Sequence, residues 1–277
     1  MLAGIDVICH AAGWSSFEKT GKSSSRSYLE PTLDLINRAV EWRVSRFVNL
    51  SSIYVAPFMQ RNNAEIRGKP RSYWPMINHL IAVEDYMREY YSRCQFINLR
   101  LGLYSGKRLN MGLLPLLLAR SQHRALPCIR GPLGYLPLVD GQDIGQAFAR
   151  AALAPLDAAY TSLNISGPST PSQAEAMKFI EQQIQHPVLG TALPAFMVDP
   201  WLWLRGKLQK QGNQPLFTPA MLNMLKSPPI DNLGATHNLG YDPEISWQAS
   251  LLNTLELYKN QSLNTQISQH ERALNIS

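Results

Sequence analysis

Few side chains in this sequence are spaced for catalysis or for metal binding. His10 and His79 have no carboxylate or second histidine at ligand spacing, so we interpret both as packing residues. Asp140 and Asp143 could form a carboxylate pair, but Asp143 stands where a helix is expected to begin and is predicted to be its N-cap. The three cysteines form no CxxC motif and have no histidine at metal spacing. The sequence therefore predicts no metal site.

Dinucleotide binding needs a different feature, a glycine-rich turn between a strand and a helix. The glycines of such a turn let the pyrophosphate approach the helix N-terminus. The N-terminal part of the chain has no turn of this kind, and no strand precedes Gly4. We therefore expect the 277-residue chain to bind a dinucleotide weakly or not at all.

The elements that would position these residues alternate between short apolar runs and amphipathic segments. Strands are predicted at residues 5–10, 47–50, 96–99 and 162–166, and helices at residues 28–42, 76–91, 143–153 and 247–258. Thr218 and Pro219 are predicted to cap and open another helix. This alternation of strands and helices is typical of βαβ units and indicates a parallel sheet.

Composition limits the classes of function. The net charge is +6, but Lys and Arg are scattered, so we predict no nucleic-acid surface and only mild attraction for anionic ligands. No segment approaches the ~20 apolar residues of a membrane span. Trp201 and Trp203 are interpreted as helix-packing residues rather than membrane anchors. Isolated cysteines and the absence of a signal-peptide pattern predict a cytoplasmic protein.

Six segments form an ordered series along the chain. They are IDVICHAAG, EPTLDLINRAVEWRVSRFVNLSS, LRLGLYSG, LPLVDGQDIGQAFARA, SLNISGP and LGYDPEISWQASLLNTLELY. In this order, from Ile5 to Tyr258, they resemble motifs of the extended short-chain dehydrogenases/reductases, the superfamily of NAD-dependent epimerases and dehydratases. Each motif is weak alone, but six in register are a strong signal. The sequence pattern after Gly106 is most similar to that of the 3β-hydroxysteroid dehydrogenase and flavonoid reductase branch.

The resemblance implies a site at the ends of the strands. Ser52 stands at the position of the family's active-site serine, although a strand-end cap is an equally good interpretation. The segment LRLGLYSG resembles the strand end that lines the nicotinamide pocket. The expected cofactor contacts are Ala11, Ala12, Gly13, Arg100 and Gly102.

The family's acid/base pair follows the pattern YxxxKxxxE, in which the lysine holds the ribose and lowers the pKa of the tyrosine. A tyrosine that titrates at about 10 needs such a cation to work near neutral pH. Glu84 matches the last position, which puts Leu80 at the lysine and Met76 at the tyrosine. A thioether cannot transfer a proton, and leucine carries no charge. Tyr73 is an alternative acid/base, but Ile77 at its partner position also supplies no cation.

Together, the pattern and the resemblance predict an α/β protein. We expect an incomplete Rossmann-like doubly wound parallel sheet, without the first strands and the glycine-rich turn, and a small α-rich substrate region. Residues 1–166 are expected to form the remainder of the nucleotide-binding domain, with residues 106–139 contributing to the substrate cleft. Residues 167–260 are expected to form the substrate region, and residues 261–277 a disordered tail.

The resulting hypothesis is an NAD(P)-dependent oxidoreductase or epimerase-type protein by lineage, catalytically impaired, whose small-molecule substrate carries a hydroxyl or carbonyl group. NAD or NADP is implied by the resemblance alone. The alternatives are a non-catalytic ligand-binding or regulatory protein, and a fragment of a longer reading frame. The first strand would expose an edge of the sheet, which is an aggregation hazard. A second copy of the chain or another partner is therefore expected to cover that edge.

Overall fold

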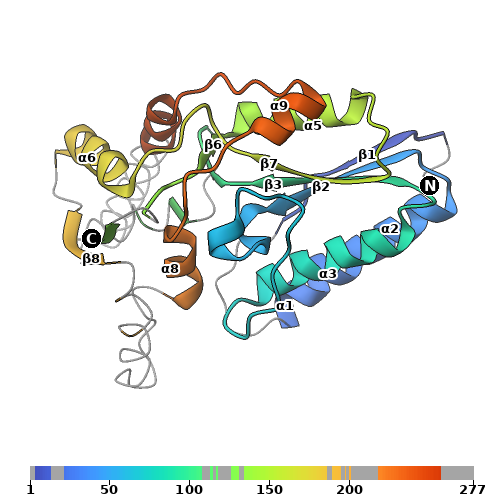
Figure 1. The fold of residues 1–277 in the computed structure, drawn as a ribbon, viewed down its shortest axis with the longest axis horizontal. Helices are drawn as coiled ribbons and strands as arrows, with labels where there is room; N and C mark the ends of the chain where they lie inside the picture. The colour runs from blue at the N-terminus through green and yellow to red at the C-terminus, as the bar shows by residue number, and fades with distance from the viewer. Residues whose placement is uncertain are drawn as a thin grey trace, which may run out of the picture.

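The computed structural model describes residues 4–13, 22–107, 113, 114, 117, 126–130, 134–185, 189–194, 197, 200 and 218–256. At its centre is a parallel sheet of four strands in the order β1-β2-β3-β7 (Figure 1). The strands are β1 (Val7–His10), β2 (Arg46–Ser52), β3 (Gln95–Leu101) and β7 (Tyr160–Ile165). The predicted parallel sheet is confirmed, with strand ends shifted by two residues at most. The edges of the sheet are β1 and β7, and what covers β1 stays a prediction.

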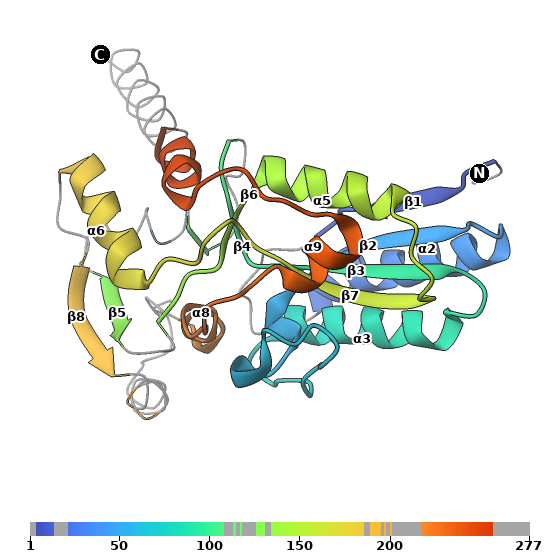
Figure 2. The ribbon, with the colours of Figure 1, turned by 45° about the horizontal axis from the view of Figure 1, so that its top comes forward.

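Helices cover both faces of this sheet, as Figures 1 and 2 show. One face lies under α2 (Glu30–Glu41) and α3 (Pro75–Tyr90), and the other under α5 (Gly141–Leu153) and α9 (Leu233–Leu239). The short α1 (Lys22–Ser24) and a π-helical turn (Ser25–Leu29) lead into α2. Apolar strand residues are buried against both helical layers in two separate clusters. The fold is therefore doubly wound, as predicted.

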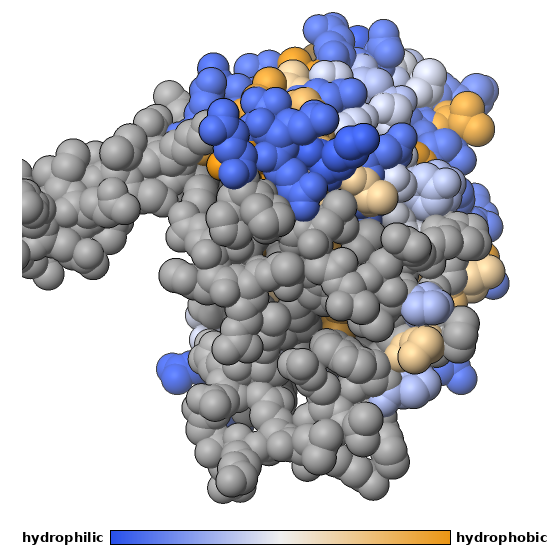
Figure 3. Space-filling model, turned by 90° about the vertical axis from the view of Figure 1, so that its left-hand side faces the viewer, coloured by the Kyte–Doolittle hydropathy of each residue, from blue (hydrophilic) through white to orange (hydrophobic). Residues whose placement is uncertain are grey.

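The remaining described elements lie beyond the ends of these strands. Two small parallel pairs join β4 (Leu103–Ser105) with β6 (Leu138–Asp140), and β5 (Leu126–Arg130) with β8 (Leu189–Pro194). The helices here are α6 (Gln173–Ile184), α8 (Pro219–Leu225) and residues 247–256. Thr218 caps α8, as predicted, by accepting a hydrogen bond from the Met221 backbone N–H. On the face in Figure 3, the described residues are mainly hydrophilic, with apolar residues scattered singly.

Several predictions concern residues outside this description, namely Trp201, Trp203 and the tail from residue 261 to residue 277. The proposed domain boundaries also stay predictions. Among the described residues, no helix is both long enough and apolar enough to cross a membrane.

The prediction that Asp143 caps its helix is wrong. The helix α5 begins two residues earlier, at Gly141, and the side chain of Asp140 accepts a hydrogen bond from the Gln142 backbone N–H at 2.9 Å. The Asp143 carboxylate instead accepts from the backbone N–H groups of Glu244 and Ile245 at 3.0 and 3.2 Å. These two bonds link α5 to the segment before the last helix. Burial raises the pKa of Asp143.

Candidate functional site

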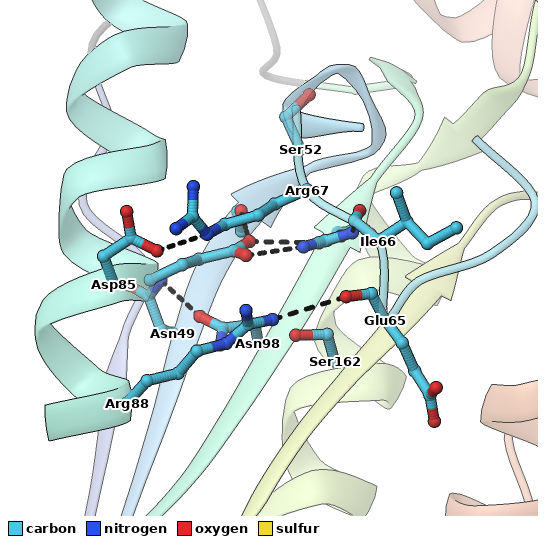
Figure 4. Close-up of polar contacts among 12 residues, drawn as sticks. Asn49, Ser52, Glu65, Ile66, Arg67, Asp85, Arg88, Asn98 and Ser162 are labelled. Atoms are coloured by element: carbon cyan, nitrogen blue, oxygen red, sulfur yellow. Dashed lines mark hydrogen bonds and ion pairs between the residues drawn. The ribbon is translucent and has the colours of Figure 1, made fainter. Parts of the chain in front are cut away.

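A row of polar side chains crosses the sheet on the face that α3 covers. The row takes one residue from each strand in register: His10, Asn49, Asn98 and Ser162. The His10 Nδ1 atom lies 3.1 Å from Asn49 Oδ1, and Asn49 Nδ2 donates to Asn98 Oδ1 at 2.9 Å (Figure 4). Because buried polar groups usually keep their hydrogen bonds, these two contacts join β1, β2 and β3, whereas Ser162 shares the register without a hydrogen bond to Asn98.

A second polar row, two residues further along the strands, holds a buried ion pair. The Arg100 guanidinium on β3 donates to both carboxylate oxygens of Glu84 on α3, at 3.0 and 2.6 Å. The Ser51 hydroxyl on β2 donates to the same carboxylate at 2.6 Å. A further Arg100 nitrogen donates to the Ile66 carbonyl at 2.7 Å. Glu84 and Arg100 are both 0% exposed, so α3 is locked to the sheet at this point.

This anchor fixes where the rest of α3 lies. A crossover helix runs antiparallel to the strands it connects, so the N-terminal turns of α3 lie toward the carboxyl ends of β2 and β3. Leu80 and Met76 stand one and two turns before Glu84, about 6 and 12 Å along the helix axis. Leu80 is 4% exposed within the core, and Met76 packs partly buried against the same cluster. The positions that the family pattern gives to lysine and tyrosine therefore hold apolar side chains that pack against the core.

Ser52, at the end of β2, lies further along this strand than Asn49, as Figure 4 shows. Its hydroxyl oxygen accepts from the Tyr54 backbone N–H at 3.4 Å and so caps the 3-10 turn Ile53–Val55. The side chain is half-buried and keeps an accessible surface. The cap is thus observed, while a role in orienting substrate stays a prediction.

Tyr73, the alternative acid/base, precedes α3 rather than lying within it. It is 39% exposed, and its hydroxyl oxygen accepts from Asn223 Nδ2 on α8 at 3.3 Å. Ile77, at the partner position, is a buried aliphatic residue and supplies no cation. Burial lowers the pKa of Arg71, and Tyr73 partly offsets this effect, so the two groups interact electrostatically. The Arg71 guanidinium itself donates to the carbonyls of Tyr54 and Ala56 at 2.9 and 3.0 Å.

A second arginine near Tyr73, Arg61, is completely buried. It follows the 3-10 turn Phe58–Gln60, and its guanidinium lies 4.4 Å from the centre of the Tyr54 ring. It donates to the carbonyl of Lys226 and, at 2.8 Å, to the side-chain oxygen of Asn223. No carboxylate among the described residues pairs with it, and burial lowers its pKa to about 10.

The predicted cofactor contacts fall into two groups. Ala11, Ala12 and Gly13 follow β1 and are exposed, so a ligand could approach them. Arg100 has no exposed surface, and its donors serve Glu84 and Ile66. A Cβ at Gly102 would overlap the Pro137 carbonyl, so this glycine allows two backbone segments to touch. Arg100 and Gly102 thus pack within the protein, and the cofactor role of all five residues stays a prediction.

A whole dinucleotide does not fit the described residues. The small side chains after β1 leave room for a ligand, but Leu80 offers no cation for a ribose. The described residues around β1 also form no glycine-rich turn before a helix that could hold a pyrophosphate. Within the same part of the chain, no group of three His, Cys, Asp or Glu side chains could hold a metal ion.

The polar row makes stability depend on pH through His10. Burial lowers the pKa of His10 below the ordinary 6.5, so the unfolded chain binds a proton more readily than the folded one. This contribution is complete above about pH 6.5 and is lost as the pH falls through that value. We expect the melting temperature to fall less between about pH 7 and pH 5 in His10→Gln than in the parent, as measured by circular dichroism. An equal fall in both proteins would contradict a buried neutral histidine.

Three strands carry a signal that would have revealed the polar rows. Each has polar residues two positions apart inside an apolar run: Asn49 and Ser51, Asn98 and Arg100, Ser162 and Asn164. Because alternate strand residues share a face, these pairs define a polar stripe. Arg61 had no comparable signal in the sequence.

The comparisons with known proteins concern the fold. No protein-family model and no curated protein matches this sequence. Among similar solved structures is MoeE5 in complex with UDP-glucuronic acid and NAD, at 17% identity and a TM-score of 0.65, covering 94% of this chain and 81% of that chain. UDP-glucuronic acid 4-epimerase from Bacillus cereus in complex with NAD is 15% identical, with a TM-score of 0.68 and coverage of 94% and 76%. UDP-glucose 4-epimerase from Thermotoga maritima with UDP-glucose is 14% identical, with a TM-score of 0.66 and coverage of 93% and 78%. The chain shares the Rossmann-like α/β fold of these proteins.

Proposed function

We propose that this chain belongs to the extended short-chain dehydrogenases/reductases and keeps their substrate cleft without their tyrosine–lysine proton-transfer pair. The shared fold and the six ordered motifs support the lineage. In this proposal the chain binds a small molecule that carries a hydroxyl or carbonyl group. Of the two functional classes that the sequence left open, a ligand-binding or regulatory role is then favoured over rapid turnover.

The observation that carries the proposal is the anchoring of α3. The Glu84–Arg100 ion pair fixes the register of the helix against the sheet, which supports the proposal that Leu80 and Met76 stand at the lysine and tyrosine positions of the pattern that ends at Glu84. An apolar pair at these positions can pack against a ligand and exclude water, but it cannot accept or donate a proton. Ser52 could still donate a hydrogen bond to a substrate oxygen.

The solved neighbours bear on the class of substrate. MoeE5 and the two epimerases were solved with UDP-glucuronic acid, UDP-glucose or NAD. These neighbours support a lineage that acts on sugar nucleotides more than they support the 3β-hydroxysteroid dehydrogenase and flavonoid reductase branch. We accordingly propose a sugar-type substrate, whose hydroxyl groups suit the polar end of β2.

Tyr73 gives a second candidate function, which the positions of two arginines favour. Its hydroxyl is exposed, and Arg71 and Arg61 interact with it electrostatically. Asn223 joins Tyr73 to Arg61, because its amide nitrogen donates to the Tyr73 hydroxyl and its amide oxygen accepts from the Arg61 guanidinium. In this alternative the chain is an active enzyme whose acid/base lies just before α3.

The cofactor part of the proposal predicts weak binding. We expect isothermal titration of the 277-residue chain with NAD⁺ and NADP⁺ to give dissociation constants above about 1 mM, because the described residues around β1 and α3 supply no glycine-rich turn for the pyrophosphate and no cation at Leu80 for the ribose. Gly13→Trp is the matched control, because it fills the exposed loop after β1. A micromolar dissociation constant that this variant abolishes would contradict the prediction and would place the dinucleotide at residues 11–13.

A further inference from the structure

A cavity lies along the free edge of β7, and the proposed substrate site lies elsewhere, at the ends of the strands. It has a volume of about 850 Å³, within the range of small-molecule sites, and none of the site residues expected from the sequence lines it. Its walls are the loop at residues 62–65, the strand β7, the helix α9 and the end of α3. In the described sheet no strand pairs with this edge of β7.

The walls are joined to one another at both sides of the cavity. Asn62 accepts a hydrogen bond from the Asp231 backbone N–H at 3.2 Å and donates to the Pro229 carbonyl at 2.9 Å. Near the start of β7, the Arg88 guanidinium lies 4.7 Å from the centre of the Tyr160 ring and donates to the Glu65 carbonyl at 3.4 Å (Figure 4). A further strand along β7 would have to pass between joined walls, so the shape favours a small molecule over an added peptide strand.

Buried polar atoms without a partner gather at this cavity. Two of its lining residues, Thr161 and Asn164, have a buried side-chain oxygen with no hydrogen-bond partner in the described structure. Asn164 is only 5% exposed. An unpaired buried polar atom is costly, so a ligand toward which the Thr161 or Asn164 side chain turned would stabilise that side chain by pairing its oxygen.

The charges of the lining indicate the class of ligand. Glu65 and Asp231 are acidic, and Arg88, the cation of this lining, donates to the Glu65 backbone carbonyl and lies against the Tyr160 ring. This balance disfavours a phosphate or another anion. The other polar lining groups are amides and hydroxyls, each of which can pair with a sugar hydroxyl.

We propose that the cavity along β7 is a binding site for a neutral, hydroxyl-rich small molecule such as a monosaccharide or polyol, separate from the cleft at the ends of the strands. The site is held by Thr161, Ser162 and Asn164 of β7 and is closed by α9. Binding at this site requires no cofactor, so the ligand can bind here whether or not the proposed function is correct.

The test uses the whole chain and a blocking variant. Saturation-transfer NMR and calorimetry are run with a panel of aldohexoses, N-acetylhexosamines and hexitols, and with inorganic phosphate as the anionic contrast. We expect saturable binding of at least one neutral member with a dissociation constant of about 1 mM or lower, and none of phosphate. Asn238→Trp, on the cavity wall, should weaken that binding about tenfold or more, whereas His237→Trp, its exposed neighbour outside the lining, should leave it unchanged.

A second variant separates ligand binding from structural support. Thr161→Val keeps the shape of the side chain but removes the unpaired hydroxyl, so the melting temperature should be unchanged or higher while sugar binding weakens about fivefold. No saturable binding of any neutral panel member would overturn the proposal, as would binding that survives Asn238→Trp. Phosphate binding in place of sugar binding would overturn the assigned ligand class.

Discussion

Replacing Glu84 with glutamine is expected to lower the free energy of unfolding by about 3–5 kcal/mol, the usual cost of removing one partner of a buried ion pair. The Arg100 guanidinium would keep its charge in a site with no exposed surface, and a glutamine amide can satisfy only part of its donors. Ser51 would lose its charged acceptor as well. Since whole domains are stable by about 5–15 kcal/mol, the loss should be plain in urea unfolding followed by circular dichroism.

The neighbouring residue supplies the matched control. Asp85 pairs with Arg67 at 2.5 Å, but both side chains are more than a third exposed, so Asp85→Asn should cost less than about 1 kcal/mol. Glu84→Leu combined with Arg100→Leu removes both charges and should recover much of the stability that Glu84→Gln loses. Equal effects of Glu84→Gln and Asp85→Asn would mean that the ion pair does not anchor α3.

Supplying the missing acid/base pair is expected to raise turnover by about 10²–10⁴-fold, the usual contribution of general acid/base groups. The change is Met76→Tyr with Leu80→Lys, made in a chimaera whose added first strands carry a glycine-rich turn. Each single substitution should do less, because the tyrosine needs the cation to lower its pKa. Activity is measured as NAD(P)H formation or epimer exchange on a panel of UDP-sugars and small alcohols.

Two controls keep this result interpretable. Thermal unfolding of each variant checks that a lysine at position 80, which is buried in the parent, is accommodated with its charge at the strand ends. Tyr73→Phe in the same chimaera should have little effect. Rapid turnover in the chimaera without the new pair, abolished by Tyr73→Phe, would instead identify Tyr73 with Arg71 as the working acid/base.

The sequence predicted the elements and their order well because periodicity is local. The apolar runs gave all four strands of the main sheet, and the amphipathic spacing gave α2, α3 and α5. The cap of α5 was assigned to Asp143 because both Asp140 and Asp143 are good N-cap residues, and only the observed helix start decides between them.

The sites were harder to predict because they depend on contacts between distant parts of the chain. The row from His10 to Ser162 draws on strands spread over more than half of the sequence, and its alignment depends on register. The ion pair joins a helix to a strand that follows it, and the cavity along β7 needs α9 beside the loop after β2. A buried arginine with no carboxylate partner among the described residues, such as Arg61, is unusual because most arginines are exposed.

The contacts of Arg61 also set the order in which the molecule can come apart. Its guanidinium joins the segment after β2 to α8, across more than 160 residues of sequence, and Tyr54 donates to the Met224 carbonyl in the same place. If α8 detached alone, a charge and a tyrosine hydroxyl would remain in the interior without these partners. Detachment of α8 and exposure of residues 54–61 are therefore one cooperative opening, so amide protection from hydrogen exchange in the two segments rises and falls together.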